Sequence, residues 1–451
     1  HMIWPTNGSR LATATMFTLF FAGNDFAPQT LVNGEPIQDF LQRHYLMAFQ
    51  EVARRLHGLD CVIGYEVINE PLSGFIGIKD LIRPTLPVKF GPLVSPLQSM
   101  LLGSGIPQEI EIWKRTLLRS RLSERKWLNP QRMRIWREGK KLPVSAEQAV
   151  PAEQIVPAEQ IVPDGVWRQN GVWDLDEKGH PRLLRPHHFS TVNGKEVNFS
   201  DDYLRPFANR FATAIRAVQP DILIFLETDP RMPPPNWGPE DVPNIVYAPH
   251  WYDATVLFLK TFSPWIGFDV HTGKVVLGRR RVQHSFTNQL ARHKEYAAKF
   301  LNNSPTLIGE IGIAFDLNHR RAYQNGDYRQ QVQALNRSLR ATEENLLSYA
   351  LWNYTPDNDN THGDQWNGED LSIYSCDQCS CRDDPYSGGR ALQAVIRPYP
   401  RAVAGEPLRL SFDPNRKVFQ FEFRHQPNIQ ALTELFIPDY QYPDGYNIWL
   451  S

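Results

Sequence analysis

CVIGYEVINEP, residues 61–71, joins an apolar run to an amide, a carboxylate and a proline. The first eight residues predict a buried strand, and Pro71 prevents the strand from continuing. The strand therefore delivers Asn69 and Glu70 at its carboxyl end. In parallel α/β barrels, that end of the sheet holds the catalytic groups.

A second strand ends in the same way. Residues 305–309 read PTLIG and are followed directly by Glu310. Retaining glycoside hydrolysis needs two carboxyl groups: one donates a proton to the leaving oxygen, and the other attacks the sugar as an ionised nucleophile. Glu70 and Glu310 are therefore candidates for the acid/base and the nucleophile.

Helices and strands alternate along much of the chain, which predicts a parallel sheet. Apolar spacing indicates helices at 37–57, 202–218, 286–302 and 325–345. The strands expected after 61–68 are 222–226 ending at Glu227, 245–248 ending near His250 and Tyr252, 305–309 ending at Glu310, and 347–351 ending at Trp352 and Asn353.

Residues 74–200 interrupt this alternation and read as a long insertion rich in Pro and Gly. Three copies of a six-residue repeat at 146–163 (AEQAVP, AEQIVP, AEQIVP) predict a surface spacer. The basic stretch 114–141 reads as a solvated face. The apolar stretch 75–102 fits a wall for a lipid and an ordinary packed loop equally well.

The pattern changes from about residue 398. Residues 408–412 and 418–423 alternate at period two around a turn at 413–417, which predicts a β-hairpin. The domain boundaries expected are therefore a catalytic barrel at 1–397 and the start of a small C-terminal β-sandwich domain at 398–451.

Composition narrows the classes of function. A hydrophobic content of 41% fits an ordinary globular core, and a net charge of −1 gives no reason to expect nucleic acid as a partner. The apolar run 11–23 is too short to span a bilayer and predicts a core segment. The absence of a signal-peptide pattern favours a cytoplasmic location, with membrane-associated and vacuolar locations as alternatives.

Four cysteines do not form a disulfide framework. Cys61 is expected to be a buried thiol in its strand. The spacing of Cys376, Cys379 and Cys381 is similar to half of a zinc site, but no second ligand pair follows, so we expect a loop with free thiols. The sequence predicts no metal site and no cofactor.

The ordered set of strand ends resembles glycoside hydrolase family 5: Asn-Glu-Pro, then His-x-Tyr, then Gly-Glu, then Trp-Asn. Stretches such as FTLFFAGNDFAP (17–28), LIGEIGIAFD (307–316) and WNYTPDNDN (352–360) resemble the fungal endoglycoceramidase-related branch, which includes steryl β-glucosidases and glucosylceramidases. The resemblance implies a retaining (β/α)8 TIM barrel with Glu70 as acid/base and Glu310 as nucleophile. The substrate-binding residues expected are Asn69, His250, Tyr252, Trp352, Asn353 and Glu227.

The chain departs from the family pattern at its start. The family places its acid/base after the fourth strand, yet only 69 residues precede Glu70, which leaves no room for three earlier βα units. The branch's strand-three His and Asp have no counterpart here. We therefore expect a barrel that lacks its first strands, in a chain that is an internal piece of a longer protein.

The function expected is a retaining β-glucosidase that hydrolyses a glucolipid, either an ergosteryl β-glucoside or a glucosylceramide, without cofactor or metal. Its partners would be the glucolipid and, transiently, a membrane surface, with no nucleic acid. The alternatives are an endoglycoceramidase that releases oligosaccharide from glycosphingolipids, and a non-catalytic fragment that binds lipid or sugar.

Overall fold

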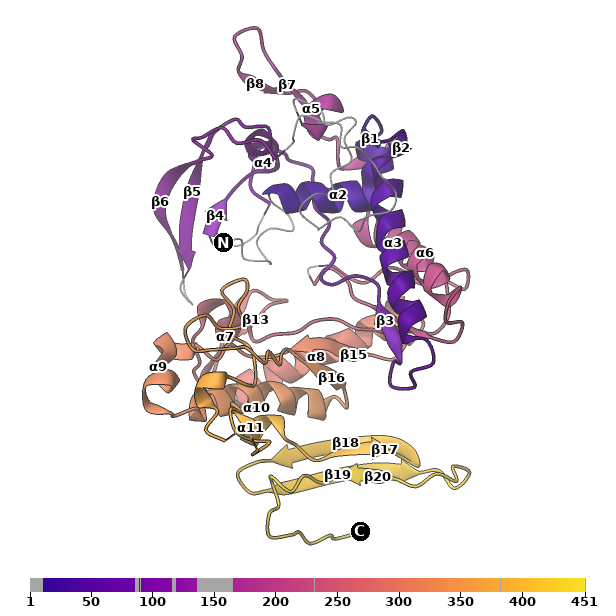
Figure 1. Ribbon diagram of the computed structural model, residues 1–451, viewed down its shortest axis with the longest axis vertical. Coiled ribbons are helices and arrows are strands. Elements are labelled where there is room, and N and C mark those ends of the chain that lie inside the picture. The colour runs from indigo at the N-terminus through magenta and orange to yellow at the C-terminus, as the bar shows by residue number, and fades with distance from the viewer. Residues whose placement is uncertain are drawn as a thin grey trace. The chain divides into compact units, whose positions relative to one another are not determined.

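The computed structural model describes residues 11–85, 89, 91–115, 119–135, 165–230, 232–381 and 383–450 (Figure 1). The repeat at 146–163, predicted to be a surface spacer, lies outside these residues. The chain divides into two compact units. We call residues 2–245 with 300–302 the N-terminal unit, and residues 246–299 with 303–451 the C-terminal unit.

Three helices build the aromatic core of the N-terminal unit: α2 (Leu11–Phe26), α3 (Ile37–Leu56) and α6 (Arg205–Arg216). Each contributes one ring to a cluster of Phe20, Tyr45 and Phe207, whose centroids lie 4.8 to 5.8 Å apart. The apolar run predicted as a core segment is therefore confirmed, in the form of helix α2. Among the described residues, no helix is both long and apolar enough to cross a membrane.

The predicted apolar face of α3 is only partly correct. The apolar spacing that predicts this helix puts Val52 on its apolar face, yet Val52 is 45% exposed, whereas Gln42 is buried. The Gln42 side chain donates to the Phe20 carbonyl at 2.8 Å and accepts from Arg210 at 2.9 Å. A buried amide that is hydrogen-bonded on both sides can take a core position, and apolar spacing alone does not reveal it.

The strand that delivers Glu70 is shorter than predicted. Strand β3 (Gly64–Glu66) pairs in parallel with β11 (Leu223–Leu226). Residues 59 and 62 belong to turns after α3, because their N–H groups donate to Leu56 and Leu59. Cys61 lies in this turn and is exposed, so the prediction of a buried thiol was wrong.

The insertion folds as antiparallel and irregular structure, as its composition indicated. Among the described residues of 75–102, most apolar side chains are buried: Phe75, for example, is fully buried against Trp167 and Phe189, which supports the packed-loop interpretation. Of the basic stretch 114–141, the described residues Arg121, Arg125 and Lys126 lie exposed on strand β6. Before the insertion, β1 (Leu31–Val32) and β2 (Glu35–Pro36) form a short antiparallel pair. The elements from residue 74 to α6 are β4 (Gly91–Leu93), α4 (Pro96–Gly103), β5 (Gln108–Arg115), β6 (Ser120–Leu128), α5 (Val166–Gln169), β7 (Trp173–Leu175), β8 (Pro181–Leu183), β9 (Thr191–Val192), β10 (Lys195–Glu196) and a π-helical turn at Ser200–Leu204.

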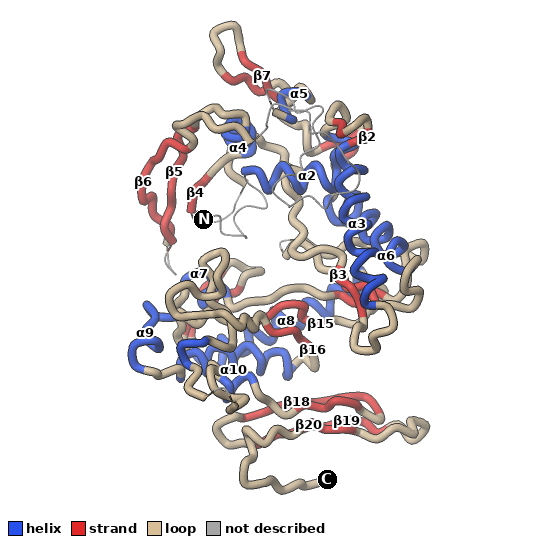
Figure 2. The backbone as a smooth tube through the Cα atoms, in the orientation of Figure 1, coloured by secondary structure: helices blue, strands red, loops and turns tan. Residues whose placement is uncertain are grey.

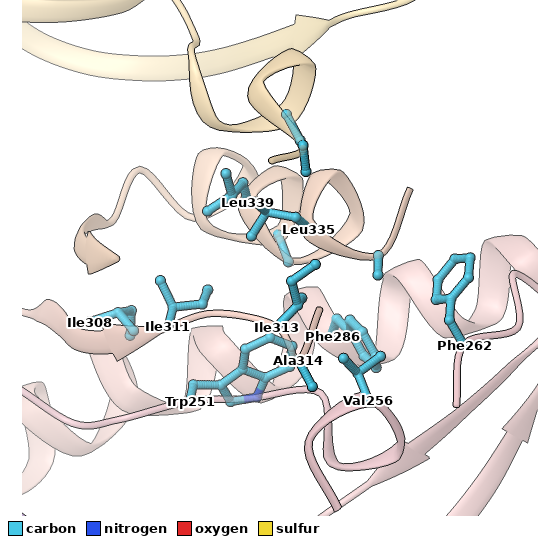
Figure 3. Close-up of a cluster of buried hydrophobic side chains, with 14 of the residues drawn as sticks. Trp251, Val256, Phe262, Phe286, Ile308, Ile311, Ile313, Ala314, Leu335 and Leu339 are labelled. Carbon is cyan, nitrogen blue, oxygen red and sulfur yellow. The ribbon is translucent and has the colours of Figure 1, made fainter. Parts of the chain in front are cut away.

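In the C-terminal unit, three strands run in parallel: β12 (Ile245–Tyr247), β15 (Leu307–Ile311) and β16 (Ser348–Leu351). Tyr247 bridges Thr306, and β15 pairs with β16. Helices α8 (Arg279–Phe300) and α10 (Arg329–Glu344) bury Phe286, Leu335 and Leu339 in the same core as Ile308, Ile311 and Trp251 (Figure 3). Helix–strand alternation around a parallel sheet is thus confirmed, although α8 begins seven residues earlier than predicted.

Antiparallel strands precede the irregular C-terminal segment (Figure 2). The predicted hairpin is confirmed as β18 (Gly405–Asp413) with β19 (Val418–His425), and β17 (Tyr399–Ala402) pairs with β20 (Glu434–Phe436). The buried Glu343 of α10 accepts from Arg397 at 2.7 Å and from the Phe412 N–H at 3.2 Å, which fixes β18 to the helix. The remaining elements of this unit are α7 (Ala254–Leu259), β13 (Ile266–Asp269), β14 (Lys274–Leu277), α9 (Leu317–Asn325), a 3-10 turn at Cys376–Gln378 and α11 (Leu392–Val395).

A buried ion pair fixes α7 against α10. The Arg337 guanidinium lies 2.5 Å from Asp253, with side-chain exposures of 8% and 1%, and is 4.8 Å from the rings of both Phe262 and Phe286. Asp253 also caps α7, because it accepts from the Thr255 N–H at 3.0 Å. The carboxylate therefore depends on a single buried cation.

We predict that Arg337→Met lowers the free energy of unfolding by about 3–5 kcal/mol, because it leaves the buried Asp253 charge without its cationic partner. Arg329→Met on the same helix is the control. That arginine is 83% exposed in its pair with Asp327, and a surface pair contributes only about 0–1 kcal/mol. Chemical denaturation of both variants measures the difference, and equal losses would contradict the prediction.

Candidate active site

Glu310 lies near the carboxyl end of β15, and both of its carboxylate oxygens have partners. The Tyr252 hydroxyl donates to one oxygen, and His250 Nδ1 lies 3.3 Å from the other. The side chains of His250 and Glu310 are only 6% and 15% exposed. The carboxylate is therefore held in one orientation in a largely dry environment, as a positioned nucleophile requires.

Strand alternation explains how His250 and Tyr252 reach Glu310. The segment after β12 continues alongside β15: Gly309 N–H donates to the Pro249 carbonyl and Trp251 N–H to the Glu310 carbonyl, both at 3.0 Å. Successive side chains of an extended segment point to opposite sides. Trp251 consequently enters the core, 4% exposed, while its two neighbours face the carboxylate.

Two glycines allow the neighbouring backbone to approach Glu310 closely. A Cβ on Gly309 would lie 2.7 Å from the Ala248 carbonyl oxygen, and one on Gly312 would lie 2.1 Å from the Trp352 carbonyl oxygen. Both distances are too short for any other residue. This role of the glycines was not predicted. Glycines on either side of Glu310-Ile311 indicate a close approach of neighbouring backbone.

Trp352 and Asn353 follow β16, on the other side of Glu310. Trp352 N–H donates to the Ile311 carbonyl at 2.8 Å, and the peptide bond between Trp352 and Asn353 is cis. The Asn353 side-chain oxygen is buried and has no hydrogen-bond partner among the described residues. A buried acceptor of this kind is suited to receive a hydroxyl group of a ligand.

A buried polar network, which no sequence pattern predicted, joins residues of the segment that follows Trp352 and Asn353. Arg390 donates to Asp370 at 2.7 Å, and Asn358 donates to Asp370 and Asp364 at 3.1 and 2.7 Å. The backbone of Asn353 joins it, because Ile373 N–H donates to the Asn353 carbonyl at 2.9 Å. The network thus determines the path of the chain after Trp352.

In the N-terminal unit, Glu70 and Glu227 follow the paired strands β3 and β11. Glu227 is 1% exposed, and its carboxylate accepts a hydrogen bond of 2.5 Å from the Glu70 N–H. Glu70 has a φ of +45°, in the left-handed region that few non-glycine residues adopt. This contact stabilises the unusual backbone conformation at Glu70. Glu227 was predicted to bind substrate, and its carboxylate holds the backbone of Glu70, the predicted acid/base.

Asn69 is exposed and Glu70 is half-buried. Asn69 is thus accessible to a ligand. Within each unit taken by itself, the described residues bring together no set of three His, Cys, Asp or Glu ligand atoms.

Two family models match about half of the chain. Residues 186–358 match Cellulase (glycosyl hydrolase family 5), and residues 397–451 match the glycoside hydrolase family 5 C-terminal domain. These two matches include the strand ends at Glu227, Tyr252, Glu310 and Trp352.

Curated relatives extend over nearly the whole chain. A glucosylceramidase of Rhizopus delemar is 33% identical over 98% of this chain and 65% of its own length, and one of Aspergillus fumigatus is 30% identical over 99% and 68%. An ergosteryl-beta-glucosidase of Saccharomyces cerevisiae is 34% identical over 83% and 51%. The chain therefore spans about two thirds or less of the length of these relatives.

A solved structure is similar as well. The crystal structure of Cryptococcus neoformans sterylglucosidase 1 matches with a TM-score of 0.85 and 31% identity, over 97% of this chain and 66% of that one.

We predict that Glu227→Ala lowers the free energy of unfolding by about 1–3 kcal/mol, because it leaves the Glu70 N–H without an acceptor. Glu227→Gln keeps an acceptor oxygen at the same position and should lose less. Urea denaturation of the two variants and the parent tests this, and two indistinguishable variants would show that the hydrogen bond does not support Glu70.

Proposed function

Because the chain belongs to glycoside hydrolase family 5, we propose that it carries the catalytic residues of a retaining β-glucosidase that hydrolyses a glucolipid. Family membership gives it a TIM-barrel catalytic domain followed by a C-terminal domain. The observation that carries the proposal is the Glu310 carboxylate, held by Tyr252 and His250 at the end of β15.

The reaction proposed is a double displacement. Glu310 attacks the anomeric carbon and forms a glycosyl-enzyme, while Glu70 protonates the leaving oxygen. Glu70 then removes a proton from water, which attacks the same carbon and releases glucose with its β configuration retained. A retaining mechanism places the two carboxyl groups roughly 5 Å apart, and we expect that separation.

The other residues orient the carboxylates and the sugar. The Tyr252 hydroxyl fixes the direction from which Glu310 attacks, and Glu227 holds the backbone of Glu70. Asn69 is placed to bind the sugar 2-hydroxyl. The Asn353 side-chain oxygen supplies an acceptor for a further hydroxyl, and Trp352 provides an aromatic face on which a sugar ring can stack.

The relatives support a glucolipid as the substrate class. Those that extend over most of the chain are named glucosylceramidase or ergosteryl-beta-glucosidase, and both names describe removal of glucose from an apolar aglycone. This favours a glucosidase over an endoglycoceramidase. We propose that the enzyme meets its substrate at a membrane surface, reached from the cytoplasm.

An incomplete barrel is also part of the proposal. In the part of the chain that the structure describes, β3 pairs in parallel with β11, and β15 with β16, whereas a (β/α)8 barrel has eight parallel strands. Missing strands leave sheet edges without partners and expose apolar surface. The described part of the insertion between β3 and β11 adds antiparallel strands.

We predict that Glu310→Gln abolishes hydrolysis of ergosteryl β-glucoside and glucosylceramide, by at least roughly a thousandfold, because the nucleophile is lost. Glu196→Gln is the control, since that glutamate forms an exposed ion pair with Lys79. Circular dichroism confirms the fold of both variants, and NMR of the first-formed sugar should show the β anomer. Persistent turnover by Glu310→Gln, or release of the α anomer, would contradict the mechanism.

We predict that the 451-residue chain is much less active than a protein that also contains the remaining barrel strands, because a shift of a catalytic group by about 1 Å costs roughly a hundredfold in rate. A chromogenic β-glucoside assayed with both proteins measures the difference. Comparable turnover would show that the barrel in this chain is sufficient.

A further inference from the structure

Three free cysteines lie within six residues of one loop, outside the candidate active site. Cys376 and Cys381 are exposed, and Cys379 is half-buried. We propose that Cys376 and Cys379 form a reversible disulfide under oxidising conditions, which makes this loop a redox-sensitive modification site. The proposal does not depend on the proposed glucosidase function.

Backbone geometry selects this pair of thiols. Residues 376–378 form a 3-10 turn, and the Cys379 N–H donates to the Cys376 carbonyl at 3.1 Å. In a 3-10 turn, side chains three residues apart are eclipsed, and a rise of about 2 Å per residue separates their Cα atoms by about 6 Å. That separation lies at the centre of the range found in disulfides, about 5.5–6 Å.

The competing pair is Cys379 with Cys381, and the 3-10 turn does not bring these two thiols together. The turn ends before Cys379, and the chain bends at Ser380. The Cys381 N–H donates instead to the Ser387 oxygen at 3.0 Å. Cys376 is therefore the partner that the turn presents to Cys379.

Contacts around the turn keep it in this conformation. Cys376 N–H donates to the Asn358 carbonyl at 2.9 Å, and Asp377 accepts from the Asn360 N–H at 2.8 Å. Both anchors belong to the segment that follows Trp352 and Asn353. The thiols thus sit on a fixed turn, which increases their effective concentration toward each other relative to a flexible loop.

Oxidation would change the partners of Cys379. In the reduced protein, its sulfur accepts a hydrogen bond from the Ser387 hydroxyl at 3.8 Å. The same Ser387 oxygen accepts from the N–H groups of Ser380 and Cys381 at 2.8 and 3.0 Å. A bond between Cys376 and Cys379 removes one of these contacts, so the loop around Ser387 differs between the reduced and oxidised proteins.

The exchange needs a small-molecule disulfide such as oxidised glutathione. The exposed Cys376 thiolate attacks one glutathione sulfur, forms a mixed disulfide and expels one glutathione thiolate, which takes up a proton. The Cys379 thiolate then attacks the Cys376 sulfur and expels the second glutathione. Two protein thiols are oxidised by two electrons, and one oxidised glutathione is reduced to two thiols.

The experiment equilibrates the full 451-residue chain with glutathione redox buffers and measures intact mass, thiol number and the linked peptides. We expect loss of two thiols, a mass decrease of two hydrogen atoms, and a link between Cys376 and Cys379 that dithiothreitol reverses. Cys376→Ser and Cys379→Ser should instead carry glutathione on the remaining thiol. Cys381→Ser and Cys61→Ser are the matched controls and should behave like the parent.

The same measurement in guanidinium chloride isolates the contribution of the fold. We expect the equilibrium constant for the internal disulfide against glutathione to be at least tenfold larger in the native chain than in the denatured chain. The proposal is overturned if the parent keeps glutathione adducts without an internal link, if the link maps to Cys381 or Cys61, or if denaturation leaves the constant unchanged.

Discussion

The close approach of three parallel strand ends around Glu310 is the constraint on which the C-terminal unit depends. Gly309 and Gly312 have no side chain at the two points where the carbonyls of Ala248 and Trp352 meet β15. Because the strands can approach, Trp251 and Trp352 donate their backbone N–H groups to β15 at 3.0 and 2.8 Å. The segments that carry His250, Tyr252 and Asn353 are then brought to one edge of the sheet.

The order of the strand ends could be read from the sequence because each strand is a short apolar run followed by polar or aromatic residues. That pattern predicted a parallel sheet, and the parallel pairing of β15 with β16 confirms it. The hairpin of β18 and β19 could also be predicted, because period-two alternation lies on both sides of the turn at 413–417. The local sequence pattern is enough to predict a helix or strand where one face of that element is uniformly apolar.

Features that depend on partners distant in sequence could not be predicted in this way. Gln42 occupies a core position of α3 because Phe20 and Arg210 satisfy its amide, and neither is adjacent to it in the sequence. Cys61 is exposed because turns after α3 use the residues that an apolar run assigned to a strand. Glu227 contacts the backbone of Glu70 across 157 residues, which no local pattern encodes.

The buried acceptor of Asn353 has a thermodynamic consequence for the unliganded protein. An oxygen removed from water without a hydrogen-bond donor destabilises the folded state by about 1–3 kcal/mol. A hydroxyl group that enters the site returns this free energy, and since only the folded chain offers the acceptor, ligand binding and folding are linked. The buried acceptor is therefore a local weak point of the C-terminal unit, and a hydroxyl compound that binds to it would stabilise the fold as well as react.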